Sequence, residues 1–280
     1  MEAPGRIWFG YIAAVALVAV GFFSSDVRAV ALAGVMLVAT VAGEWYRGRQ
    51  AALAAAAQDA DLPELVSRWA RGWAYSRGFP RPEAVPGGVR IDVGEPGRRV
   101  EWVATDAPET LAGLVDTARA TPEAWLSVVT DSPGSVRPWF AEGGLQADGE
   151  EALMSIDLAA HGSRELPEGY RAEVAREGGV IFVTVRSGEA VAATGRVAVI
   201  GADAVADRIQ TDPEHRRRGL GGAVMARLVS AAREAGAVRG LLVASEMGEP
   251  LYARLGWHAE ARVVMARSAP PPTPVESRHG

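Results

Sequence analysis

The segment HRRRGLGG, residues 215–222, lies between a stretch with strand character and a stretch with helix character. Residues 205–211 (VADRIQT) before it are expected to form a strand, and Leu220, Val224 and Leu228 recur after its start at helical spacing. A strand that turns sharply into a glycine-rich helix start is typical of folds that combine a sheet with flanking helices. We therefore expect a sheet and a helix to meet at this segment.

The glycines and arginines of this segment predict an anion site. The first amides of a helix have no partner within the helix, and the helix dipole favours negative charge there. Glycine lets a ligand approach these amides without meeting a Cβ atom, and arginine adds charge-assisted hydrogen bonds. The pattern is neither a Walker A loop, because no Lys-Ser/Thr follows Gly222, nor a dinucleotide fingerprint, because Val224 stands where the third glycine belongs. The alternative is a basic helix start that is merely solvated.

Composition excludes several classes of site. The chain of 280 residues has no cysteine, so disulfides, thiolate nucleophiles and cysteine-ligated metals are excluded. Its four histidines show no metal-ligand spacing, and we expect no metal. A net charge of −5 gives no support for nucleic-acid binding.

Two uncharged apolar runs, residues 7–23 and 29–43, stand near the N-terminus and are separated by SSDVR. As helices they would each reach about 22–27 Å, slightly short of a bilayer core of about 30 Å. A hairpin would bring Trp8 and Trp45 to one interface, and the arginines outside the runs favour a cytoplasmic location for both ends. We therefore expect a membrane contact through residues 7–46 and a membrane-anchored protein whose catalytic domain is cytoplasmic. The alternatives are a buried soluble hairpin and an untranslated leader.

The remaining chain reads as a mixture of helices and strands. Asp61 and Glu64 form a capping-box pattern, and Gly78 and Pro80 end the helix that follows. A second helix opens at Asp106. Alternating or continuous apolar runs predict strands at 89–93, 100–104, 125–130, 180–185, 190–200, 205–211, 241–244 and 261–267, and helical patterns cover 219–235 and 250–255. From Ser268 a proline-rich tail is expected to be disordered.

A weak internal repeat relates residues 126–145 to residues 241–257. Both segments read as strand, loop, short helix, glycine and strand, and the alignment places Phe140 on Tyr252. If the repeat is real, the first block is a relative of the second without its chemistry, because it has neither the arginine–glycine loop nor the tyrosine. Chance similarity is the alternative.

Two motifs together resemble the GNAT superfamily of N-acetyltransferases. RRRGLGG matches the Arg/Gln-x-x-Gly-x-Gly/Ala signature with Arg216, Gly219 and Gly221 on its fixed positions, and EPLYARLGW, residues 249–257, matches a second signature after the next strand. The resemblance covers about residues 168–267. It implies an α+β fold, a mixed sheet flanked by helices, preceded here by a two-helix hydrophobic hairpin. The expected domains are the hairpin (1–49), a degenerate GNAT-like α/β domain with a helical linker (50–160), a catalytic GNAT domain (161–267) and the tail (268–280).

The resemblance also implies acetyl-CoA as cosubstrate. Its diphosphate would lie on the amides around the arginine–glycine loop, and its pantetheine arm would pair with the preceding strand. Ser245 would hold this arm where asparagine is common in the family. The residues expected to bind it are Ile209, Gln210, Thr211, Arg216, Arg217, Arg218, Gly219, Leu220, Gly221, Gly222 and Ser245.

Direct attack of an amine on a thioester needs proximity, a deprotonated amine, a donor for the developing oxyanion and a proton for the thiolate. The amide near Gln210 is the candidate oxyanion donor. The resemblance implies that Tyr252 donates the proton to the thiolate. The alternative is that Tyr252 is a core aromatic residue without a role in the reaction. Asp207 and Glu246 are the candidate bases, unless both are surface carboxylates. The expected partners are acetyl-CoA and a small amine or a protein amine, and the sequence leaves the acceptor and the oligomeric state open. The alternative function is a non-catalytic module at the membrane that binds acyl-CoA or a partner.

Overall fold

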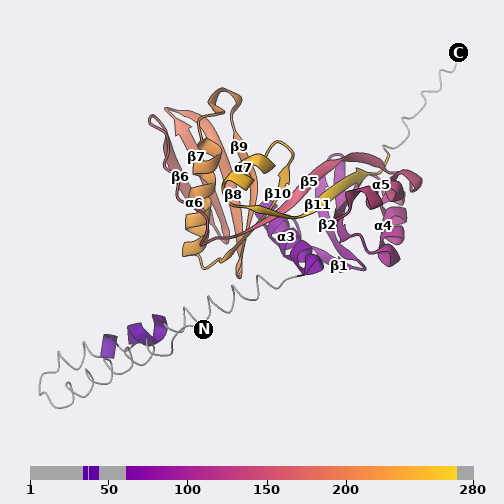
Figure 1. Ribbon diagram of the computed structural model, residues 1–280, viewed down its shortest axis with the longest axis horizontal. Coiled ribbons are helices and arrows are strands. Elements are labelled where there is room, and N and C mark those ends of the chain that lie inside the picture. Colours follow the sequence, from indigo (N-terminus) through magenta and orange to yellow (C-terminus); the bar gives the residue numbers. More distant parts are fainter. Residues whose placement is uncertain (1–33, 37, 44–60, 270–280) are drawn as a thin grey trace, which may run out of the picture. The chain divides into compact units, whose positions relative to one another are not determined.

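The computed structural model describes residues 34–36, 38–43 and 61–269 (Figure 1). The chain divides into two units, residues 1–55 and residues 56–280. In the first unit the described residues are helical, and the rest of the predicted hairpin lies outside the described residues. No helix formed by the described residues has the length and apolar character needed to cross a membrane.

The second unit is built on a mixed sheet of 11 strands, in the order β1-β2-β3-β4-β11-β5-β10-β9-β8-β7-β6. Its N-terminal half contains α3 (Leu62–Arg77), β1 (Glu83–Val85), β2 (Gly88–Glu95), β3 (Arg98–Thr105), α4 (Pro108–Ala120), β4 (Ala124–Thr130), α5 (Pro133–Glu142) and β5 (Gln146–Asp157). Its C-terminal half contains β6 (Arg171–Glu177), β7 (Val180–Ser187), β8 (Ala190–Ile200), β9 (Asp203–Thr211), a 3₁₀ turn (Pro213–His215), α6 (Leu220–Glu234), β10 (Arg239–Ser245), α7 (Glu249–Arg254) and β11 (His258–Arg267). The α+β class predicted from the sequence is confirmed.

The two halves exchange strands at the centre of the sheet. β11 from the C-terminal half lies between β4 and β5, and β5 from the N-terminal half lies between β11 and β10. The segments β4-α5-β5 and β10-α7-β11 follow the same order, and Phe140 and Tyr252 are both buried in their short helices. This symmetry supports the internal repeat. The predicted domain division at residue 160 falls between β5 and β6, but it stays a prediction because the sheet is continuous across the halves.

Helix α3 begins and ends where the sequence predicts. The Asp61 carboxylate accepts a hydrogen bond from the Glu64 amide at 2.9 Å, and Gly78 ends the helix with a φ of 71°. Gly72 allows close packing on β9, because a Cβ atom there would lie 2.1 Å from a methyl carbon of Val205. α3 therefore covers one face of the sheet, with Trp69 and Trp73 buried against it.

Helices α6 and α7 pack on the opposite face of the C-terminal half, and α4 and α5 pack on that same face of the N-terminal half. This follows from the alternation along the strands: in β3, for example, Val103 packs in the α3 cluster while Val100 and Trp102 pack in the α4 and α5 cluster. Figure 1 shows α6 and α4 at the two ends of the sheet.

Two boundaries differ from the sequence expectation. Asp106 does not cap α4, because its carboxylate accepts a hydrogen bond from the Thr130 hydroxyl at 2.5 Å, and the residue at the cap position is Ala107. Ser268, expected in a disordered tail, is instead fixed to β4: its amide donates to the Ala124 carbonyl and its hydroxyl accepts from the Ala124 amide. The expected tail from residue 270 onward lies outside the described residues.

Candidate acetyl-CoA site

Strands β9 and β10 begin as parallel neighbours and then separate. Their pairing runs from Asp203 with Arg239 to Val205 with Leu241 and ends there, although β9 continues to Thr211. β9 stays paired with β8 on its other side, with a register shift at a bulge where Arg208 has a φ of 51°. The edge of β9 that faces β10 is therefore open for a ligand to pair with.

The corresponding strands of the N-terminal half do not separate. β3 and β4 are paired from Val100 with Ala124 to Thr105 with Val129, close to the end of both strands. A slot between parallel strands is therefore built into the C-terminal half alone within residues 61–269, as the degenerate first copy predicts.

The arginine–glycine loop closes the end of this slot. Asp212 caps the 3₁₀ turn through the Glu214 amide at 2.9 Å, and the Arg216 side chain donates back to the Thr211 carbonyl at 3.2 Å. Arg217 and Gly219 have φ angles of 62° and 81°, which turn the chain into α6. Gly219 is the N-cap of α6 and offers no side-chain acceptor, so the first amides of the helix remain available to an anion.

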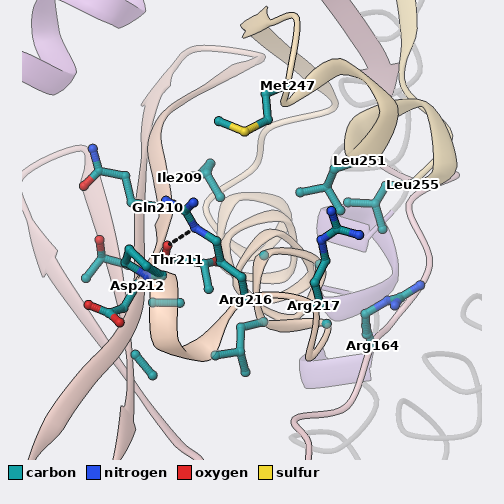
Figure 2. Close-up of a pocket in the computed structure, with 18 of the residues that line it drawn as sticks. Arg164, Ile209, Gln210, Thr211, Asp212, Arg216, Arg217, Met247, Leu251 and Leu255 are labelled. Atoms are coloured by element: carbon teal, nitrogen blue, oxygen red, sulfur yellow. Dashed lines mark hydrogen bonds between the residues drawn. The ribbon is translucent and has the colours of Figure 1, made fainter.

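A cavity of about 1260 Å³ extends from the slot to the loop and to α7 (Figure 2). It is lined by all the residues expected to bind acetyl-CoA except Arg218 and Ser245. Arg218 instead donates to the Tyr170 hydroxyl at 3.0 Å, and the Ser245 hydroxyl accepts from the Gly248 amide at 3.3 Å. Most of the motif residues therefore line one cavity, whereas the Arg218 and Ser245 side chains form hydrogen bonds with other residues of the protein.

The sequence prediction missed several lining residues. Arg164 comes from the segment between β5 and β6, and Arg254 comes from α7. The guanidinium groups of Arg164, Arg217 and Arg254 form no hydrogen bond or ion pair with any described residue. Arg254 stands inside the second motif, which could have indicated it, whereas no pattern surrounds Arg164. Positive charge without partners at the rim of a cavity favours an anionic ligand with several phosphates.

Tyr252 lies in α7, next to Leu251, which lines the cavity, but is not itself a lining residue. Its ring is 8% exposed and meets Trp257 edge-on at 6.2 Å between centroids. Burial of the phenol, and second the negative charge of Asp207, raises the pKa of Tyr252 to about 12. The hydroxyl therefore keeps its proton throughout the neutral range, which suits a proton donor and excludes a role as a base there.

The two candidate bases have different surroundings. Two nitrogens of the Arg77 guanidinium donate to the two carboxylate oxygens of Asp207, each at 2.8 Å. The Arg196 guanidinium forms an ion pair with the same carboxylate at 3.4 Å. These contacts occupy both carboxylate oxygens, so an amine could reach either oxygen only by displacing an arginine. Glu246 is exposed in the turn after β10 and forms no hydrogen bond or ion pair with another described residue. Neither residue lines the cavity, and the assignment of a base to them stays a prediction.

Comparison with known proteins agrees with this geometry. Residues 177–259 match the model of the acetyltransferase (GNAT) domain. Over these residues the chain is similar to GNAT acetyltransferases. A solved GCN5-related N-acetyltransferase from Kribbella flavida is 19% identical with a TM-score of 0.56, over 74% of this chain and 96% of that one. This likeness shows that the GNAT fold extends beyond the matched domain. A GCN5-related N-acetyltransferase from Sphaerobacter thermophilus is 13% identical with a TM-score of 0.47, over 64% of this chain and 75% of that one. Among curated protein sequences there is no match.

Proposed function

We propose that this protein is an acetyl-CoA-dependent N-acetyltransferase that transfers an acetyl group to a primary amine by direct attack. The observation that carries the proposal is the open edge of β9 leading into the arginine–glycine loop. An open strand edge followed by free helix amides and unpaired arginines fits a ligand that carries amides at one end and phosphates at the other.

The shape of the loop supports this ligand. A Cβ atom at Gly221 would lie 3.0 Å from a methyl carbon of Leu251, and one at Gly222 would lie 2.8 Å from the Arg164 side chain. Glycine at these two positions therefore leaves space for a ligand in the cavity next to the first turn of α6. Residues 209–211 would pair with the pantetheine amides, while the α6 amides together with Arg216 and Arg217 would hold the diphosphate.

The reaction needs little covalent chemistry from the protein. Acetyl-CoA supplies the acetyl group as a thioester. The backbone near Gln210 would donate a hydrogen bond to the carbonyl oxygen as negative charge develops on it. Tyr252 would hold the proton destined for the thiolate, and the closed core around its ring would fix the direction of the hydroxyl. Holding the amine and the thioester together supplies much of the rate enhancement.

We also propose that residues 7–46 anchor the protein to a membrane, with the acetyltransferase domain on the cytoplasmic side. This rests on the two uncharged runs and the distribution of arginines in the sequence.

The function is tested by measuring thiol release from acetyl-CoA in the presence of single amines. The panel comprises benzylamine, tyramine, putrescine, glycinamide and a short peptide with a free α-amine, and mass spectrometry identifies an acetylated product. We expect amine-dependent release with at least one of them. Acetyl-CoA binding without release across a broad panel would favour the acyl-CoA-binding module, and absence of binding would refute both functions.

A further inference from the structure

The segment that joins the two halves of the sheet, residues 158–170 between β5 and β6, runs beside the start of α6. The Arg227 side chain of α6 donates to the Arg164 carbonyl at 3.3 Å. The Tyr170 hydroxyl accepts from Arg218 of the arginine–glycine loop at 3.0 Å, and the Tyr170 ring packs against the core that α6 covers. The joining segment therefore forms a wall next to the loop.

The Arg164 side chain reaches from this segment to the first turn of α6. A Cβ atom at Gly222 would lie 2.8 Å from Arg164 Cδ and 3.1 Å from Arg164 Nε. A Cβ atom at Gly221, the preceding residue, would instead lie 3.9 Å from the Thr211 hydroxyl of β9. Arg164 and β9 therefore flank the helix start from two sides, and both line the same cavity.

Figure 2 shows the order of groups across this cavity. Residues 209–211 of β9 lie on one side, Arg164 lies on the other, and Arg217 lies between them. In the proposed complex the pantetheine arm pairs with residues 209–211, and the diphosphate lies at the loop. The part of CoA beyond the diphosphate would therefore extend toward Arg164. That part is the adenosine, which carries a phosphate on its 3′-oxygen.

The charges around the cavity leave two arginines for a further anionic group. Four arginines line it, and among the described lining residues the one carboxylate is that of Asp212. Arg216 and Arg217 would face the diphosphate. The guanidinium groups of Arg164 and Arg254 have no hydrogen-bond or ion-pair partner among the described residues. A phosphomonoester carries a charge of about −1.5 to −2 at neutral pH and has three strong acceptor oxygens, which suit a guanidinium group.

We propose that Arg164 binds the 3′-phosphate of CoA, with Arg254 as a second cation, so that the protein selects CoA thioesters over forms that lack this phosphate. This deepens the proposed function and rests on it. Arg164 lies outside residues 177–259, which match the GNAT domain model, so the resemblance does not account for it. The segment between the halves thereby contributes to cofactor recognition.

The test measures binding of CoA and of dephospho-CoA, which lacks the 3′-phosphate, to the full chain by calorimetry. We expect the unsubstituted protein to prefer CoA by about 10- to 100-fold, the scale of one or two charge-assisted hydrogen bonds. In Arg164→Gln the affinity for CoA should fall by about 5- to 20-fold, because the contact is partly exposed to solvent, while the affinity for dephospho-CoA stays the same. Arg164→Lys should retain part of the preference, because it keeps the charge but loses the planar fork.

Arg233→Gln is the matched control. Arg233 is exposed in the last turn of the same helix, about 20 Å from its start, so its loss removes the same charge at a distance where salt screens it. Both affinities should therefore match those of the unsubstituted protein. Arg254→Gln should reduce the preference for CoA as Arg164→Gln does. Circular dichroism confirms that each variant is folded before titration.

The two ligands separate the possible roles of Arg164. Equal weakening of both in Arg164→Gln would show that the arginine contacts the diphosphate or supports the fold, and unchanged affinity for CoA would show that it makes no contact. Either result would overturn the inference, and so would equal affinity of the unsubstituted protein for the two ligands. Failure of the unsubstituted protein to bind either ligand would instead refute the proposed function.

Discussion

Substitutions of Gly221 separate the shape of the arginine–glycine loop from its charge. In the structure a Cβ atom at this position would lie 3.0 Å from Leu251 Cδ2 and 3.9 Å from the Thr211 hydroxyl. The added side chain therefore enters the cavity between β9 and α7. Gly221→Ala adds the Cβ atom alone, Gly221→Gln adds a neutral side chain, and Gly221→Glu adds nearly the same shape with a negative charge.

The charge effect can be estimated from Coulomb's law. A carboxylate about 6 Å from one phosphate charge, at an effective dielectric constant of about 20, is disfavoured by about 3 kcal/mol. The arginines at the loop offset part of this. We therefore expect Gly221→Glu to weaken acetyl-CoA binding by about 10- to 100-fold, which corresponds to about 1.4–2.7 kcal/mol. Gly221→Gln should lose only the steric part, and Gly221→Ala less still, because the Leu251 methyl group can shift by a few tenths of an ångström.

Calorimetric titration with acetyl-CoA measures all three variants, after circular dichroism has shown that each is folded. The difference between the Glu and Gln variants should shrink as salt is added, because exposed charges are screened. Unchanged affinity in folded Gly221→Glu would show that the diphosphate does not lie at this loop.

Three further predictions concern other parts of the chain. Tyr252→Phe should lower kcat by about 10²–10⁴-fold or somewhat less, with little change in acetyl-CoA affinity; steady-state kinetics with an unchanged kcat would reduce the tyrosine to a packing role. Asp203→Ala removes the close partner of the buried Arg68 guanidinium and leaves it only the exposed Glu64 at 3.8 Å, so it should lower the free energy of unfolding by about 3–5 kcal/mol in urea titrations; Asp116→Ala, which breaks an exposed pair, should cost under about 1 kcal/mol, and equal losses would contradict the assignment of a buried pair. The full chain should sediment with membranes and resist carbonate extraction, and a detergent-free, monodisperse full chain would exclude a spanning hairpin through residues 7–46.

The sequence predicts elements whose signals are local. The capping pattern at Asp61 and the glycine at position 78 mark the two ends of α3, and helical spacing marks α6. Asp106 shows the limit of such signals: the sequence predicts that a helix opens there, but the Asp106 carboxylate accepts a hydrogen bond from Thr130, a residue of β4 that the sequence does not place nearby, and α4 begins at Pro108. β6 was missed because its residues are almost all exposed and its apolar pattern is weak.

The sequence does not predict which strands pair with one another. Nothing in the periodicity of β5 indicates that it lies between β10 and β11, because strand pairing depends on contacts far apart along the chain. The same holds at the site. The contiguous loop was predicted from its own residues, but Arg164 reaches the cavity from a segment without a motif. The environment of Asp207 likewise depends on Arg77, 130 residues earlier in the chain.

The central claim is that acetyl-CoA binds between β9 and the start of α6, in the C-terminal half alone. Amide hydrogen exchange with and without acetyl-CoA tests it most directly, because open strand edges and free helix amides are the groups that the ligand would cover. We predict slower exchange at residues 209–211 and 217–222, and no change at the end of β3 or the start of α4, where β3 and β4 remain paired. Unchanged exchange at the loop under saturating acetyl-CoA, or equal protection in both halves, would contradict the account.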